Sequence, residues 1–168
     1  MKKITNVLLI LSLVITLCFP SYAMQCNYYY LNPISSKSTL LPYDINQSAA
    51  KERAVKRGAF FAGADLTITN RNGEIGVTGK SYMTYPVDEL YMSIYVDKLE
   101  ENRWVQVAYY DFEFYAENYP DGLTSEMVDF TIDNQPKGHY YRLRGSYAAI
   151  KDGDMEGFGP MTDGVLIE

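Results

Sequence analysis

The stretch KGHYYRLRGSY, residues 137–147, decides the fold, because it reads as a β-strand that begins after a glycine turn. Its residues alternate between two faces: Tyr141, Leu143 and Gly145 on one, and Tyr140, Arg142, Arg144 and Ser146 on the other. The first face suits a hydrophobic core, whereas the second carries two guanidinium groups and a phenol. We therefore expect this strand in the middle of an antiparallel sheet.

The same period of two recurs along most of the chain. Strands are expected around residues 66–69, 75–79, 90–97, 104–114, 128–132, 139–150 and 165–167. The Asn72-Gly73 pair predicts a hairpin turn, and a shift of apolar phase predicts a β-bulge near Ala108. No helical period separates the strands, which excludes a parallel α/β sheet. The expected fold is an all-β antiparallel sandwich of about seven strands, immunoglobulin-like or related. A closed antiparallel barrel is the alternative.

The strand over residues 90–97 has the clearest alternation in the chain. Leu90, Met92, Ile94 and Val96 are expected inward, and Tyr91, Ser93, Tyr95 and Asp97 outward. Upstream, Ser48–Arg57 contains good helix formers behind a serine N-cap, which predicts a short helix. The expected organisation is therefore a signal peptide over residues 1–23, a leader with this helix over 24–57, and a β-sandwich domain over 58–168.

Residues 1–23 have the pattern of a secretory signal peptide. Two lysines precede an apolar run over residues 7–17, and Ser21-Tyr22-Ala23 predicts cleavage after Ala23. A membrane anchor is the alternative, but the run is shorter than the roughly 20 residues that a bilayer requires. The sequence therefore predicts an exported protein, with no membrane association after signal cleavage.

Charge and cysteine content restrict the partners. Without the two leader lysines, 13 basic residues remain against 21 acidic ones, a net charge of about −8. Such an acidic chain is a poor ligand for nucleic acid. Cys18 leaves with the signal peptide, so Cys26 has no internal disulfide partner and is either a free thiol or linked to another chain. No cofactor is expected.

Aromatic and basic residues on outward strand faces are the candidate binding residues. They are Tyr91, Tyr95, Tyr140, Arg142 and Arg144. Exposed aromatic side chains on a flat sheet can stack on sugars or contact proteins. For the two arginines, salt bridges or cation–π contacts across the sheet are favoured over anion binding. Tyrosine also suits half-buried strand faces, which is the structural alternative for the aromatic residues.

Two further features of the sequence are candidate chemical sites. Asp152, Asp154 and Glu156 place three carboxylates on one turn, a weak candidate for Ca²⁺, which usually takes six to eight ligands. A solvated acidic turn is favoured there. His139, the single histidine, has no nucleophile in a recognisable sequence frame and is expected to be exposed and inert. The sequence therefore predicts no catalytic residues and no metal.

Several motifs carry a resemblance to a known family over roughly residues 50–168. They are Arg57-Gly58, Ile68-Thr69-Asn70, GEIGVTG over 73–79, VDEL over 87–90, Trp104-Val105, KGHYYRLRG over 137–145, Glu156 and TDGVLI over 162–167. This set resembles a family of small secreted proteins of Gram-positive bacteria that is classed only as a domain of unknown function. The resemblance implies secretion but no activity, so no functional residues transfer from it.

The sequence favours a secreted, non-enzymatic protein that binds an extracellular or cell-envelope protein. A carbohydrate-binding module on a cell-wall glycan is the alternative, and a hydrolase without a recognisable motif is a third class. A flat aromatic strip with flanking Asn and Asp would favour sugar, and a larger patch with Met and Arg would favour protein. A deep pocket with two facing carboxylates would favour the enzyme.

Overall fold

The computed structural model describes residues 30–56 and 59–168, and within them the chain forms nine β-strands and one short 3₁₀ helix. The strands are β1 (Gln47–Arg53), β2 (Phe61–Asn70), β3 (Ile75–Val87), β4 (Glu89–Glu100), β5 (Arg103–Tyr115), β6 (Leu123–Ile132), β7 (His139–Lys151), β8 (Asp154–Phe158) and β9 (Val165–Ile167), and the helix is η2 (Ala116–Asn118). The predicted signal peptide, Cys26 and the Arg57-Gly58 pair lie outside the described residues.

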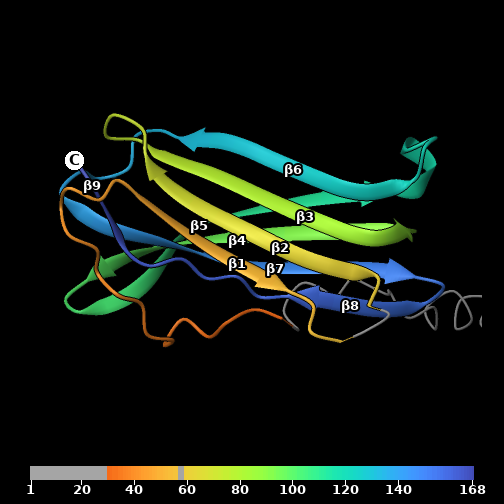
Figure 1. The fold of residues 1–168 in the computed structure, drawn as a ribbon. Helices are drawn as coiled ribbons and strands as arrows, with labels where there is room; N and C mark the ends of the chain where they lie inside the picture. The colour runs from red at the N-terminus through yellow and green to blue at the C-terminus, as the bar shows by residue number, and fades with distance from the viewer. Residues whose placement is uncertain (1–29, 57–58) are drawn as a thin grey trace, which may run out of the picture.

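The strands form two antiparallel sheets that pack face to face (Figure 1). One has the order β1-β2-β3-β6, and the other has the order β5-β4-β7-β8, with β9 also pairing with β7. Because the two sheets of the described chain stay separate, the predicted sandwich is confirmed and the barrel alternative is wrong. The expected central position of the strand around Arg142 is also confirmed, since β7 lies between β4 and the pair β8 and β9.

The core lies between the sheets and is lined by the inner faces of both. Leu90, Met92, Ile94 and Val96 belong to it, as the alternation of β4 predicts. Tyr141 and Leu143 of β7 are completely buried in the same core. Half-buried aromatic side chains close one side of the sandwich, where Phe130 of β6 contacts Tyr110 of β5 at a ring-centroid distance of 4.8 Å.

The turn between β2 and β3 keeps these two strands in one sheet. Asn72 and Gly73 have φ angles of 57° and 86°, the left-handed conformation that a type I′ turn requires at both central positions. The predicted Asn-Gly hairpin is therefore confirmed. In the immunoglobulin order the second and third strands lie in different sheets, so this hairpin gives the present sandwich a different strand order.

The predicted bulge in β5 is also confirmed. Val96 pairs with Ala108, but the next residue, Asp97, pairs with Gln106, which leaves Val107 as the extra residue. The bulge lets aromatic residues on one half of β5 face the core while Gln106 on the other half faces the outer side with Asp97.

The predicted helix over Ser48–Arg57 is wrong. Residues 47–53 form β1, which pairs antiparallel with β2 along its whole length. A short helix has little stability of its own, whereas pairing with β2 satisfies the backbone groups of both strands. Side chains of β1 also bind the C-terminal region. Ser48 Oγ accepts a hydrogen bond from the Asp163 N–H at 2.9 Å, and Glu52 Oε2 accepts one from the Gly159 N–H at 3.1 Å. The first strand thus begins before residue 58, the predicted start of the domain.

Candidate functional site

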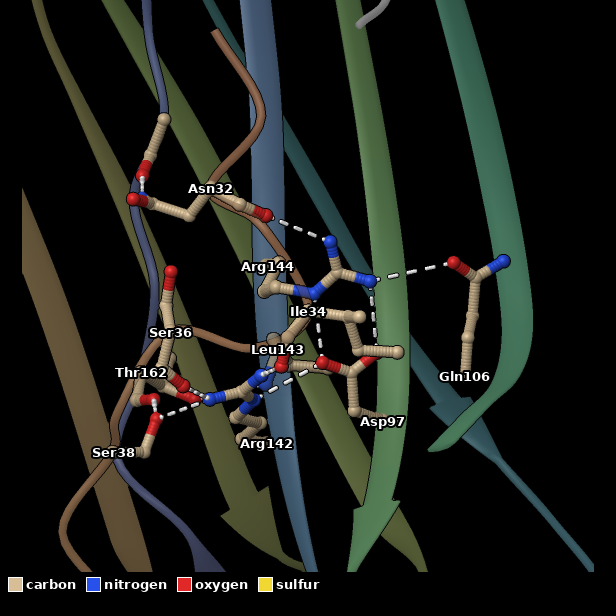
Figure 2. A network of polar contacts seen from close by, with 11 residues as sticks. Asn32, Ile34, Ser36, Ser38, Asp97, Gln106, Arg142, Leu143, Arg144 and Thr162 are labelled. Atoms are coloured by element: carbon tan, nitrogen blue, oxygen red, sulfur yellow. Dashed lines mark hydrogen bonds and ion pairs between the residues drawn. The ribbon is translucent and has the colours of Figure 1, made fainter. Parts of the chain in front are cut away.

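Arg142 and Arg144 of β7 form a buried ionic cluster with Asp97 of β4 (Figure 2). The Nε atoms of the two arginines lie 3.0 and 2.7 Å from Asp97 Oδ2, and Arg144 Nη2 lies 3.0 Å from Asp97 Oδ1. The aspartate and Arg142 have no exposed side-chain surface. Each guanidinium also lies over an aromatic ring, Arg142 over Trp104 at 4.5 Å and Arg144 over Tyr95 at 5.3 Å.

The segment over residues 30–41, which we call the strap, passes over this cluster (Figure 2). Main-chain carbonyl groups of the strap accept hydrogen bonds from the arginines: Asn32 from Arg144 at 2.8 Å, and Ile34 and Ser36 from Arg142 at 2.6 Å each. These carbonyl oxygens receive the guanidinium donors that Asp97 cannot reach.

A second set of contacts fixes the end of the strap against the chain that precedes β9. Thr39 and Leu41 exchange main-chain hydrogen bonds with Gly164 at 2.8 and 2.9 Å. The Tyr140 hydroxyl of β7 donates to the Leu41 carbonyl at 3.1 Å. The strap is therefore held mainly through its backbone, and Tyr140 acts as one of its anchors.

Arg142 and Arg144 connect β7 to Asp97 of β4 and to the strap. Burial lowers the pKa of Arg142 from its usual value, although the adjacent Asp97 acts in the opposite direction. The structure favours the salt-bridge and cation–π interpretation of these arginines, since the strap and Asp97 occupy their donors.

The predicted exposure of Tyr91 and Tyr95 is wrong. They lie on the outer face of β4, as expected, but are only 3% and 2% exposed. Tyr95 packs between Arg144 and the ring of Tyr109, whose centroid is 4.9 Å away, and Tyr91 packs edge-on against Tyr115. The outer face of this sheet is thus buried around Tyr91 and Tyr95, where side chains of β5 and β7 contact them.

The acidic turn between β7 and β8 does not gather its carboxylates. Asp152 and Asp154 are exposed, whereas Glu156 turns away and accepts the Phe61 N–H at 2.9 Å. No group of three or more His, Cys, Asp or Glu side chains in the described chain could hold a metal ion. The solvated-turn interpretation agrees with this arrangement.

His139 is exposed at the start of β7 and lines an open groove of about 500 Å³ with the β4–β5 turn. Glu100 lies in the same groove and forms an ion pair with Lys98 at 2.7 Å. The groove therefore gives His139 acidic and basic neighbours but no hydroxyl or thiol nucleophile among its lining residues.

The other sheet has an outer face that no segment of residues 30–56 and 59–168 covers, which we call the open face. It consists of the outward side chains of β1, β2, β3 and β6, the four strands of the sheet whose order is visible in Figure 1. Register places them in cross-strand rows: Ala49, Thr67, Thr78 and Asp129; then Lys51, Asp65, Lys80 and Met127; then Arg53, Gly63, Tyr82 and Ser125. Two shallow grooves of about 330 and 320 Å³ lie on this face and share Lys80.

Asp65 is the electrostatic centre of the open face. Its carboxylate accepts hydrogen bonds from Arg53 Nη1 at 2.5 Å and from the Tyr82 hydroxyl at 3.1 Å. Burial acts to raise the pKa of Asp65, but these two hydrogen bonds, together with the positive charges of Arg53 and Lys51, outweigh it and hold that pKa below its usual value. Lys51 and Lys80 flank the same aspartate on the neighbouring strands without an ion pair of their own within 4.0 Å of described carboxylates.

The sequence did not reveal this face for one main reason. Local propensity predicts a helix for Lys51 and Arg53, and a helix does not align these residues with Asp65 of β2. A weaker signal was present in the alternation of Thr67 and Thr69 with Leu66 and Ile68, which marks these threonines as outward.

Comparison with known proteins adds no family: no family model matches the chain, and neither does any curated protein. Within residues 30–56 and 59–168, no helix has the length and apolar character needed to cross a membrane.

Proposed function

We propose that the protein is a secreted, non-catalytic β-sandwich that binds an extracellular or cell-envelope protein through the open face. The observation that carries the proposal is the contrast between the two sheets. On the outer face of the β5-β4-β7-β8 sheet, Tyr91, Tyr95, Arg142 and Arg144 are buried, whereas the open face has exposed side chains on β1 and β6 and half-buried ones on β2 and β3. On the basis of its Gly-x-Tyr-Tyr-Arg-x-Arg-Gly strand, we also propose membership of the secreted Gram-positive family of unknown function.

The residue types of the open face support a protein partner. Met127 is 57% exposed. Arg53 and Tyr82 belong to the next cross-strand row, and Arg71 lies in the turn between β2 and β3. Methionine, arginine and tyrosine are enriched in protein interfaces relative to other surface. The carboxylates of this face support a non-catalytic role, because the basic side chains of Arg53 and Arg71 bind Asp65 and Asp129.

A carbohydrate-binding module is the second candidate, and one observation favours it. Thr67, Thr69 and Thr78 line the groove of about 330 Å³ with hydroxyl groups that could bind sugar hydroxyls. Sugars stack on the open face of an aromatic ring. On this sheet the Arg53 guanidinium lies over the Tyr82 ring, 5.1 Å from its centroid, and competes with a sugar for that position. We therefore rank the protein partner first.

Recovery of partners from cell wall and culture supernatant tests the proposal. The Thr67→Glu, Met127→Glu double variant places two charges on the open face and should lose the proteins that the parent recovers, with a loss of at least about 2 kcal/mol in affinity. The control is Val105→Glu, an exposed residue of β5 in the other sheet. Equal recovery by parent and double variant, with both folded by circular dichroism, would contradict the proposal.

A further inference from the structure

We infer that the partner presents an acidic, extended segment, which lies across β1, β2 and β3 and places its carboxylates on Lys51 and Lys80. This inference rests on the proposed function, because it concerns the same open face. It starts from the surplus of positive charge around Asp65.

Three basic side chains surround one carboxylate. Lys51 and Lys80 are the direct cross-strand neighbours of Asp65, and Arg53 is bound to it. One negative charge against three positive charges leaves a local surplus of two on a chain whose net charge is −6. The two lysines lie on either side of β2, on β1 and β3, so an anionic ligand that binds both would offset the surplus positive charge.

Lys51 and Lys80 act on the acids of this face only through space, where Lys51 helps to lower the pKa of Asp65 and Lys80 that of Asp129. Neither lysine forms an ion pair within 4.0 Å of a described carboxylate, and the Asp65 oxygens already accept the hydrogen bonds of Arg53 and Tyr82. Lys51 is exposed and Lys80 is half-buried, and both line the groove of about 330 Å³. Their ammonium groups are therefore available to a ligand in that groove.

The spacing of the lysines suits an extended chain. Strands β1 and β3 are separated only by β2, so the two Cα atoms lie roughly 10 Å apart. An extended peptide rises about 3.3 Å per residue, so acidic residues two to four positions apart span a comparable distance. The hydroxyl groups of Thr67, Thr69 and Thr78 lie in the same groove and can donate to or accept from the main chain of such a segment.

The test uses a fluorescent 12-residue peptide rich in Asp and Glu, and its matched amide version with Asn and Gln. Parent protein should bind the acidic peptide and not the amide, and raising the salt concentration should weaken binding. The Lys51→Ala, Lys80→Ala double variant should bind about tenfold more weakly, since two exposed ion pairs together reach that factor. A matched control is Lys37→Ala, Lys151→Ala, two lysines outside the open face, which should retain parental affinity.

Equal binding of the acidic and amide peptides, or unchanged binding by the open-face lysine variant, would overturn the inference. Tighter binding of poly(glycerol phosphate) than of the acidic peptide would also overturn it and favour an anionic polymer. Failure of this inference can be distinguished from failure of the proposed function. If the Thr67→Glu, Met127→Glu variant loses its cell-wall proteins while the lysine variant retains them, the open face is an interface but its partner is not held by acidic groups.

Discussion

At the scale of single residues, Asp97 balances two buried cations. One carboxylate accepts hydrogen bonds from both Arg142 and Arg144, so the cluster retains one positive charge. The main-chain carbonyls of the strap solvate that charge in place of water. The arrangement depends on the carboxylate because a buried guanidinium without a counterion is costly.

Replacing Asp97 by Asn should lower the free energy of unfolding by about 3–5 kcal/mol, since it leaves two buried guanidinium groups without an anion. Urea denaturation measures this loss. The matched control is Asp129→Asn, whose side chain is 42% exposed and paired with Arg71, and which should cost about 1 kcal/mol or less. Similar losses for the two variants would show that the buried cluster contributes no more than a surface pair.

At the scale of elements, β5 is an edge strand. Some of its residues favour pairing with another copy of the chain, and others oppose it. Val105, Val107 and Tyr109 expose apolar surface along its length. The bulge at Val107 and the exposed acids Asp111 and Glu113 interrupt it. Bulges and charges are common means by which edge strands avoid pairing with other copies of the same chain.

Replacing Asp111 and Glu113 by Val should therefore increase self-association through β5, because it leaves an apolar edge over most of the strand. Analytical ultracentrifugation over a range of concentrations measures the effect. The Glu117→Val, Asp121→Val control removes the same charge from the exposed loop after β5 and should associate no more than the parent. If the control associates as strongly, net charge rather than the strand edge would be responsible.

Prediction from sequence succeeded where the deciding forces are local. The alternation in 90–97 and 139–150 and the Asn72-Gly73 turn determine their structures through neighbouring residues, and each was correct. The prediction for β1 is wrong because its residues favour a helix by local propensity, whereas pairing with the edge of the following strand, β2, decides its structure. The burial of Tyr91 and Tyr95 was missed because it depends on other strands and on the packing over their sheet, which no local pattern encodes.

At the scale of the whole molecule, the strap completes the packing of one sheet. A variant that begins at residue 42 would lose the carbonyl partners of Arg142 and Arg144 and should be less stable by at least about 3 kcal/mol. Thermal and urea denaturation measure this difference. Ile34→Ser should cost less than about 1 kcal/mol, because Ile34 is 39% exposed and binds Arg142 through its main chain. A truncated protein as stable as the parent would show that the strap contributes nothing to the free energy of unfolding.

The position of the strap has a consequence for the order in which the protein can fold. Ile34 and Arg142 are 108 residues apart, and Asn32 donates to Gly159 across 127 residues. A chain is synthesised from its N-terminus, so the strap is made long before the residues that receive it. It can dock only after β7 and Gly164 have been synthesised, and closing such a long loop is slow. The strap therefore joins the sandwich among the last of its parts, when synthesis of the chain is nearly complete.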